Sequence, residues 1–440
     1  MKRRHQPTGQ FAVVTLVAGL LVGCTPAEIL APPVLQPPPQ PFPANCSSVA
    51  AGEALQPRLD AAKPGDNLCL ADGEWTGAIV IPDGVGLYGS ARSVLHTNRV
   101  GTTVLMKSKT TLRGLVIDGS GDRFDVLDSA VKIHGDDVLV EGVTIRNSAF
   151  GILAEKSHRA TIRYNRVLGV GGPALGMRGD GIRLWETNDS LVEHNRVSAV
   201  RDCVVWYSSR NMLRDNLVED SRYGVHFMYS HDNKLEHNQF RSNEVGVFAM
   251  YSRNLQLTSN AMLFSRGAAG IGIGVKESGN LTVRGNLLAH NTQGIFVDNS
   301  PLNVGDTNLF EDNIVRLSTI GVGFLSAPRD NTFRRNTFKD NTTQVRVDGG
   351  GDAMAITWTE NDWSDYAGYD LDGDGIGDLP YELRDLSDAL VSRNADLEFL
   401  RGTPALALVS VAGDVVPMFA PKPVLRDLKP RFGARSDHAR

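Results

Sequence analysis

One short phrase recurs between residues 162 and 363: IRYNRV (162–167), VEHNRV (192–197), LRDNLV (213–218), LEHNQF (235–240), LTSNAM (257–262), VRGNLL (283–288), FEDNIV (310–315), FRRNTF (333–338) and WTENDW (358–363). Each copy places an asparagine between two apolar residues, and the asparagines follow one another at steps of 21 to 30 residues. A repeat of this length is typical of a solenoid.

Each repeat contains three short runs of alternating apolar residues, separated by Gly, Asn, Asp and Ser. The repeat is too short for a strand–helix–strand unit and has no helical period. We therefore predict an all-β fold, a right-handed parallel β-helix whose coils stack about 4.8 Å apart. We expect the recurrent asparagine to adopt the left-handed conformation at a bend and to bond the next asparagine in the stack.

The composition fits one long solenoid and disfavours a nucleic-acid partner. The chain has 440 residues, of which 41% are hydrophobic and 22% charged, with a net charge of -5. A solenoid of this length escapes the size limit on a single globular core. No basic face stands out, so we expect no nucleic-acid binding.

Residues 1–24 have the pattern of a lipoprotein signal peptide. A basic start (Lys2 to Arg4) precedes an apolar run from Phe11 to Val22, and LVGC at 21–24 resembles a lipobox in which Cys24 is lipidated. The alternative is an ordinary signal peptide with a chance cysteine. Either reading predicts export, and the first predicts a lipid-anchored protein in the periplasm or cell envelope.

Residues 25–45 are rich in proline and are expected to form an extended tether that does not pack. In an exported protein, Cys46 and Cys69 are the leading candidates for a disulfide. Residues 52–62 between them have helical spacing, which predicts a cap on the first coil. Cys203 aligns with inward apolar positions, so we expect its side chain to be buried in the apolar core and not to act as a reactive thiol.

The predicted organisation has three parts after the tether. The β-helix spans 46–363, with irregular early coils from 68 to 147 in which Leu115 and Val143 replace the asparagine. An acidic Asp/Gly loop follows at 364–382. Residues 383–440 are expected to form a helical and then extended tail, with helical apolar spacing from Ala389 to Val416.

Alignment on the asparagines sorts one strand of each coil into inward and outward positions. The inward pairs are apolar: Ile182/Leu184, Cys203/Val205, Val225/Phe227, Val247/Ala249 and Ile273/Val275. The outward pairs are Arg183/Trp185, Val204/Trp206, His226/Met228, Phe248/Met250 and Gly274/Lys276, followed by Glu186, Tyr207, Tyr229 and Tyr251. An outward column of Trp, Met and Tyr residues is typical of a binding surface.

His226, Met228 and Met250 fall within reach of one ion on this surface. Thioether and imidazole donors favour Cu(I) over Zn, Ca or Mg. Exposure of these donors is expected to allow metal exchange with a partner, with Trp185, Trp206, Tyr207, Tyr229, Phe248 and Tyr251 forming the surrounding binding surface. The competing interpretation is an interface, or a surface that another part of the chain covers.

A second candidate metal site is the loop DLDGDGIGD. Asp370, Asp372, Asp374, the carbonyl of Ile376 and Asp378 alternate as in the first half of an EF-hand loop, which predicts calcium. Tyr381 stands where an EF-hand has its bidentate glutamate. The alternative is a solvated acidic turn.

Taken together, DGIRLWE, SRYGVHFMYSHDN, VGVFAMYS, GIFVDNSP and NDWSDYAGYDLDGDGIGDLPY resemble the NosD family over roughly residues 50–432. The resemblance implies a periplasmic accessory protein that handles copper during maturation of nitrous oxide reductase. It further implies cooperation with an inner-membrane ABC transporter, engaged through a C-terminal segment at about 383–435.

The competing class is a carbohydrate-binding or polysaccharide-processing β-helix protein, a lyase or epimerase, because fold alone does not decide function. Such an enzyme needs converging acid–base groups on one outward sheet. Asp180, Arg183 and Glu186 are a small charged set, but no partners are apparent for them on the other coils. The sequence therefore favours a protein that is not an enzyme, and a purely structural role leaves the aromatic column unexplained.

Overall fold

Each copy of the asparagine phrase turns the chain from one sheet into the next in the computed structural model. In the copy at 162–167, β14 (Thr161–Arg163) ends before the bend and β15 (Arg166–Gly169) begins after it. The bend residue Tyr164 has φ of 55°, in the left-handed region. The same conformation recurs one position before each repeat asparagine, at Tyr164, His194, Asp215, His237, Ser259, Gly285, Asp312, Arg335 and Glu360.

The expectation that the asparagine itself is left-handed is therefore wrong. The residue before it makes the bend, which leaves the asparagine amide pointing into the solenoid. There the amide is buried and bonds the neighbouring coils.

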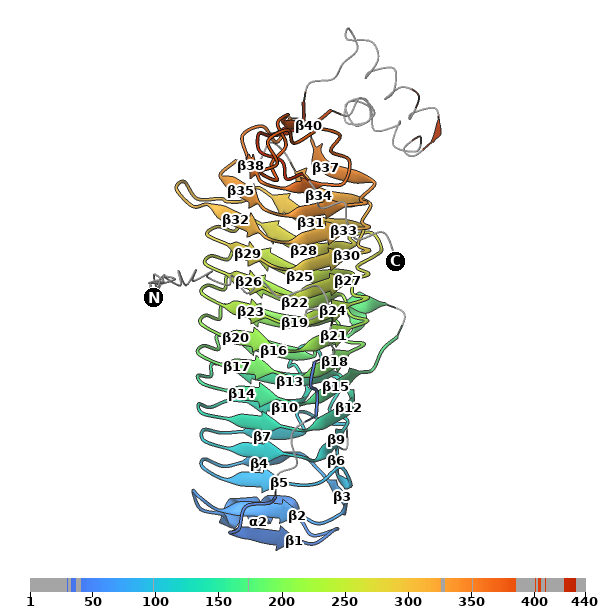
Figure 1. Ribbon diagram of the computed structural model, residues 1–440. Helices are drawn as coiled ribbons and strands as arrows, with labels where there is room; N and C mark the ends of the chain where they lie inside the picture. Colours follow the sequence, from blue (N-terminus) through green and yellow to red (C-terminus); the bar gives the residue numbers. More distant parts are fainter. Residues whose placement is uncertain are drawn as a thin grey trace, which may run out of the picture.

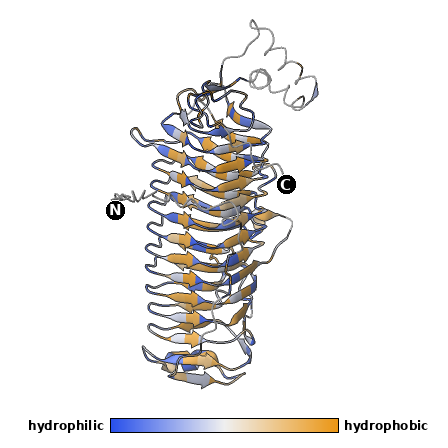
Figure 2. Ribbon diagram, in the orientation of Figure 1, coloured by the Kyte–Doolittle hydropathy of each residue, from blue (hydrophilic) through white to orange (hydrophobic). Residues whose placement is uncertain are grey.

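The structure describes residues 30, 33–36, 41–97, 99–172, 174–325, 329–349, 351–384, 400, 403, 404, 408 and 423–432. Over these residues the strands wind into a parallel β-helix, as predicted, with three sheets that run the length of the molecule (Figure 1). Figure 2 shows apolar positions repeating along the strands from coil to coil.

Sheet A has 14 strands, in the order β1 (Cys46–Val49), β2 (Asn67–Leu70), β5 (Gly86–Tyr88), β8 (Thr111–Arg113), β11 (Leu139–Glu141), β14, β17 (Leu191–Glu193), β20 (Met212–Arg214), β23 (Lys234–Glu236), β26 (Gln256–Thr258), β29 (Thr282–Arg284), β32 (Asn308–Glu311), β35 (Asn331–Arg334) and β38 (Thr357–Thr359). Sheet B has 13: β3 (Gly73–Thr76), β6 (Ser93–His96), β9 (Val116–Asp118), β12 (Thr144–Ser148), β15, β18 (Arg196–Ser198), β21 (Leu217–Glu219), β24 (Gln239–Arg241), β27 (Ala261–Leu263), β30 (Leu287–Ala289), β33 (Ile314–Arg316), β36 (Thr337–Lys339) and β39 (Asp362–Trp363). Sheet C has 12: β4 (Ile79–Ile81), β7 (Val104–Met106), β10 (Ser129–Ile133), β13 (Phe150–Glu155), β16 (Ile182–Trp185), β19 (Asp202–Trp206), β22 (Tyr223–Met228), β25 (Val245–Met250), β28 (Ile271–Lys276), β31 (Gln293–Asp298), β34 (Ile320–Leu325) and β37 (Thr343–Asp348).

The inward amides form an unbroken ladder from Asn165 to Asn361. The Nδ2 of each asparagine donates to the Oδ1 of the next at 2.9 to 3.1 Å. Below the ladder, the backbone N–H of Val143 donates to the Oδ1 of Asn165. The predicted stacking of asparagine amides is thus confirmed, and it satisfies polar groups that are buried in an apolar core.

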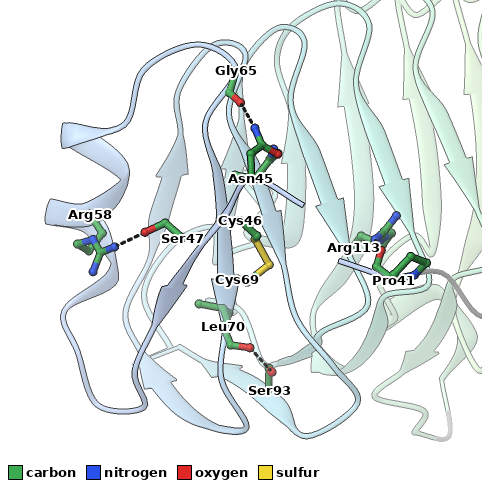
Figure 3. Close-up of a disulfide and its surroundings, with 11 residues drawn as sticks. Pro41, Asn45, Cys46, Ser47, Arg58, Gly65, Cys69, Leu70, Ser93 and Arg113 are labelled. Atoms are coloured by element: carbon green, nitrogen blue, oxygen red, sulfur yellow. Dashed lines mark hydrogen bonds between the residues drawn. A yellow bond between two sulfur atoms is a disulfide. The ribbon is translucent and has the colours of Figure 1, made fainter. Parts of the chain in front are cut away.

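The N-terminal end is closed by a short helix and a disulfide. Helix α2 (Leu55–Ala61) buries Leu55 and Leu59 against the first coils. Cys46 and Cys69 are bonded to each other between neighbouring strands of sheet A (Figure 3). Cys203 is buried in the core, and burial raises the pKa of its thiol to about 12.

The C-terminal end is closed by residues distant in sequence. Strand β40 (Tyr381–Leu383) pairs antiparallel with β41 (Leu425–Asp427), and Asp427 is buried against the last coil. The strand at 425–427 agrees with the expected extended tail, whereas the helical spacing from 389 to 416 lies almost entirely outside the described residues.

The N-terminal segment departs from expectation, because two of its residues contact the solenoid. The carbonyl of Pro41 accepts a hydrogen bond from Arg113. Leu30, in the segment expected to form a non-packing tether, packs against the outward face of sheet B. Cys24 and the signal-peptide pattern lie outside the described residues. No helix within the described part of the chain is long and apolar enough to cross a membrane.

Candidate functional site

The outward residues of sheet C form a continuous column on four successive coils. Parallel pairing places Trp185 of β16 beside Trp206 of β19, Trp206 beside Met228 of β22, and Met228 beside Met250 of β25. Next along the sheet come Lys276 and Asp298, which form an ion pair with 2.6 Å between Nζ and Oδ2. The column therefore passes from aromatic through thioether to charged side chains.

His226 and Met250 are in direct contact within this column. The Nε2 of His226 lies 3.2 Å from the Sδ of Met250. A thioether sulfur accepts but cannot donate a hydrogen bond, so Nε2 carries the ring proton in this contact. Nδ1 then holds the lone pair, and it is buried without a partner among the described residues. Met228 is next to Met250 by strand register.

Aromatic rings enclose His226 on several sides. The ring centroids of Tyr223, Trp206 and Phe248 lie 5.0, 5.7 and 6.4 Å from that of His226. Phe248 has room for its ring because Gly274 follows it on the next coil, where a Cβ atom would lie 2.4 Å from the ring. Burial lowers the pKa of His226 to about 4, although Asp202 opposes this shift.

One feature expected of this site is wrong. The sequence pattern predicts that the donors are exposed, but His226 is only 7% exposed. Alternation correctly gives the outward direction of the side chain, while the surrounding aromatic residues cover it. Met228 and Met250 are half-buried.

A buried cluster of ions lies beside this site, and most of its members are not among the residues predicted from the sequence. Asp180 accepts from Arg201 at 2.7 Å and from Arg183 at 3.2 Å, and Asp202 accepts from Arg222. Both aspartates are buried, and burial raises the pKa of Asp180 despite its arginine partners. Charges buried in this way need such partners to be stable.

The expectation that no partners on other coils meet Asp180 and Arg183 is therefore wrong. The sequence signal for this cluster is the pair Arg201–Asp202, about one repeat after Asp180, followed by Arg222 about one repeat later. Glu186 does not join the cluster, because it accepts a hydrogen bond from the Nε1 of Trp185 instead. The guanidinium of Arg183 stacks over the ring of Trp185, with its Cζ 4.6 Å from the ring centroid.

The predicted tyrosine column is a stack at the edge of sheet C. The rings of Tyr207 and Tyr229 are parallel with centroids 5.4 Å apart, and those of Tyr229 and Tyr251 are 4.8 Å apart. Tyr207 and Tyr229 remain 50% and 40% exposed, so their ring edges face solvent. This surface is available for contact with another molecule.

The acidic loop brings three of its five predicted ligands together. Carboxylate oxygens of Asp370, Asp372 and Asp374 all lie within 4.8 Å of one another. The Oδ2 of Asp378 instead accepts the backbone N–H of Leu371. Backbone donors also hold Asp370, whose carboxylate accepts from the N–H groups of Gly373 and Gly375.

The fold and the outward face together define a parallel β-helix protein with histidine, methionine and aromatic side chains gathered on one sheet. The family described as "Periplasmic copper-binding protein (NosD)" matches residues 169–368. The chain is 29% identical over 380 residues to the "Probable ABC transporter binding protein NosD" of Pseudomonas aeruginosa, covering 82% of this chain and 87% of that protein. It is 27% identical over 360 residues to the protein of the same name from Stutzerimonas stutzeri, covering 77% and 81%. The chain is thus similar to NosD proteins over most of its length.

Among solved structures, the A-module of the Azotobacter vinelandii mannuronan C-5 epimerase AlgE6 is similar, with a TM-score of 0.55 and 15% identity. The similarity covers 70% of this chain and 92% of that module. At this identity the likeness concerns the β-helix fold alone.

Proposed function

We propose that this protein is a periplasmic accessory protein that is not an enzyme and that binds Cu(I) on sheet C as cargo. The contact between His226 and Met250 is the observation that carries the proposal. The description of the family as copper-binding and the names of the two relatives, which refer to an ABC transporter, support it.

The donor set fits a soft monovalent ion. Zn²⁺, for comparison, binds nitrogen and sulfur at about 2.0 and 2.3 Å, so two donor atoms 3.2 Å apart can share one ion. Binding through Nε2 requires the neutral tautomer with the ring proton on Nδ1, so the ion would replace the hydrogen bond between His226 and Met250. Thioether and neutral imidazole donors favour Cu(I). Met228, beside Met250 in the sheet, would supply the third donor. The low pKa of His226 keeps the imidazole neutral at the pH of a periplasm.

Titration with Cu(I) under reducing conditions, against a competing chelator, tests the site. Met228→Leu with Met250→Leu keeps side-chain volume and removes both sulfurs, so we expect a folded protein with at least tenfold weaker binding. The matched control is Met177→Leu with Met354→Leu, which removes two exposed thioethers elsewhere. Equal affinity in the site variant and the wild type would refute copper binding at this site.

We propose that residues 385–422 engage a membrane-bound ABC transporter during maturation of nitrous oxide reductase. Strands β40 and β41 lie on either side of this segment and pair with each other. Replacing 385–422 by a short Gly/Ser linker therefore leaves the closure of the solenoid in place. We expect this variant to bind Cu(I) normally and to lose co-purification with the transporter; retained co-purification would place the interface elsewhere.

Lipid anchoring through Cys24 is part of the proposal, and it rests on LVGC at 21–24. We expect Cys24→Ser to move the protein from the membrane fraction to the soluble fraction of cells. Soluble wild-type protein would refute the anchor.

The alternative function, binding or processing of a carbohydrate, is favoured by the exposed Tyr207 and Tyr229 at one edge of sheet C. The buried carboxylates of Asp180 and Asp202 lie at the opposite edge of the same sheet. Aromatic side chains supply the large amphipathic surface that sugar binding uses. Calorimetric titration with neutral and uronate oligosaccharides tests it, with Tyr207→Ala and Tyr229→Ala as the variants. Binding that these changes abolish would establish the alternative.

A further inference from the structure

Sheet B carries an apolar strip on its outward face. Ala261 and Leu263 in β27, and Ala289 in β30, point away from the core, as does Leu287, yet each is at most 7% exposed. The inward position of the same strands is taken by other residues, such as Met262. Outward apolar residues in register on two coils require a cover, because burying them is favourable by about 25 cal/mol for each Å².

The chain's own N-terminal segment supplies part of that cover. Leu30 packs against this strip, and eleven residues later the carbonyl of Pro41 accepts from Arg113 in β8. The strip lies six coils beyond β8, or about 29 Å at the usual strand spacing. Eleven residues can span about 36 Å, so the chain length accommodates both contacts. Leu30 and Pro41 thus both contact the side of the solenoid.

Basic side chains flank the strip at positions of sheet B that are in register with Leu263 and Ala289. Register places Arg241 beside Leu263 at one end, and Ala289 beside Arg316 and then Lys339 at the other. Within the described residues these three cations form no ion pair, although Glu219 is next to Arg241 in the sheet and Asp362 interacts electrostatically with Lys339. An apolar strip between cations that no carboxylate neutralises in an ion pair is complementary to anionic phospholipid headgroups.

We propose that sheet B is the membrane-facing side of the protein. Its apolar strip holds the N-terminal segment at Leu30, and Arg241, Arg316 and Lys339 contact anionic phospholipid. Where Cys24 is lipidated, as proposed above, the anchor lies six residues from Leu30, a reach of about 20 Å. The solenoid then lies along the membrane instead of standing on its N-terminal cap.

Vesicle binding by the Cys24→Ser protein tests the surface without any lipid anchor. The net charge of -5 opposes general attraction to anionic lipid, so binding has to come from a local basic face. We expect co-sedimentation with vesicles of phosphatidylglycerol and phosphatidylethanolamine, and none with phosphatidylcholine. Arg241→Glu, Arg316→Glu and Lys339→Glu together should weaken binding at least tenfold.

The matched control is Lys109→Glu, Lys156→Glu and Lys234→Glu, which changes the charge equally at exposed positions away from sheet B. Circular dichroism checks the fold of both triple variants. Absence of binding to anionic vesicles, or equal loss in the two triple variants, would overturn the proposal while leaving the lipidation test unaffected.

Orientation of the anchored protein is a second test. Cys46 and Cys69 are bonded and Cys203 is buried, so an introduced surface cysteine can be labelled selectively. One variant carries a fluorophore at Thr337→Cys in sheet B, and the other carries it at Thr282→Cys in sheet A. We expect lipid with a spin label on its headgroup to quench the first fluorophore more strongly than the second. Equal quenching in membrane-bound protein would overturn the side-on arrangement even if Cys24 is lipidated.

Discussion

The Nδ2 of Asn361 donates a hydrogen bond to the Oδ2 of Asp427, 66 residues away, at 3.0 Å. The same oxygen accepts the backbone N–H of Asn361 and the Nε1 of Trp363. Asp427 thus takes the place that the next asparagine would occupy in the ladder. A solenoid needs its open ends capped, and at the C-terminal end this carboxylate accepts the hydrogen bonds that the last coil would otherwise leave unmade.

Replacing Asp427 by alanine should open the C-terminal end. Three buried donors lose their acceptor, so we expect the last coil to lose about 3 kcal/mol of stability. Hydrogen exchange at residues 358–363, with denaturant unfolding, measures the effect. Asp427→Asn keeps an acceptor oxygen and should lose much less; equal exchange in all three proteins would contradict this role.

Removal of one amide inside the ladder should destabilise the solenoid. In Asn260→Ala, two donors of Asn238 lose their acceptor and the carbonyl of Leu235 loses its donor. We expect the free energy of unfolding to fall by about 2–4 kcal/mol. Gln256→Ala, an exposed truncation four residues earlier, is the control and should change stability by less than about 0.5 kcal/mol.

Calcium should raise the thermal midpoint. The converging carboxylates of Asp370, Asp372 and Asp374 repel one another until a cation binds, and a ligand that binds the native state stabilises it. Thermal unfolding with calcium and with chelator measures the shift. Asp372→Asn with Asp374→Asn should remove it, whereas Asp122→Asn with Asp330→Asn should not. An unchanged midpoint in the wild type would leave the loop as a solvated acidic turn.

Cys203 should be inert in the native protein. Burial raises the pKa of its thiol to about 12, so the reactive thiolate is scarce at pH 8 and is also shielded. A chromogenic disulfide reagent should report no free thiol in the native Cys24→Ser protein and one after unfolding in denaturant. Rapid reaction of the folded protein would contradict the buried position.

The repeat made much of the fold predictable from sequence. A period near 22 sets the coil, and alternation along each strand sets which side chains point outward. These rules placed Trp185, Trp206, Met228 and Met250 in one column, because residues that lie side by side on neighbouring parallel strands are one repeat apart in the sequence. They also found the asparagine ladder, although they assigned the left-handed conformation to the wrong residue of the bend.

Periodicity says where a side chain points, but not what covers it. The rings of Tyr223, Trp206 and Phe248 bury His226, and their packing follows from side-chain conformations that no repeat encodes. The ion cluster was missed in part because the pairing shifts by one residue between Asp202 and Val204, which breaks simple alignment.

The sequence by itself determined the coil, the ladder and the direction of the side chains along one strand of the regular coils, because these depend on contacts between residues one repeat apart. The tertiary structure alone decided the contact of Leu30 with sheet B and the closure by Asp427. Both join segments outside the repeat to coils far away in sequence. Such contacts have no period, since they depend on which surfaces the finished solenoid leaves uncovered.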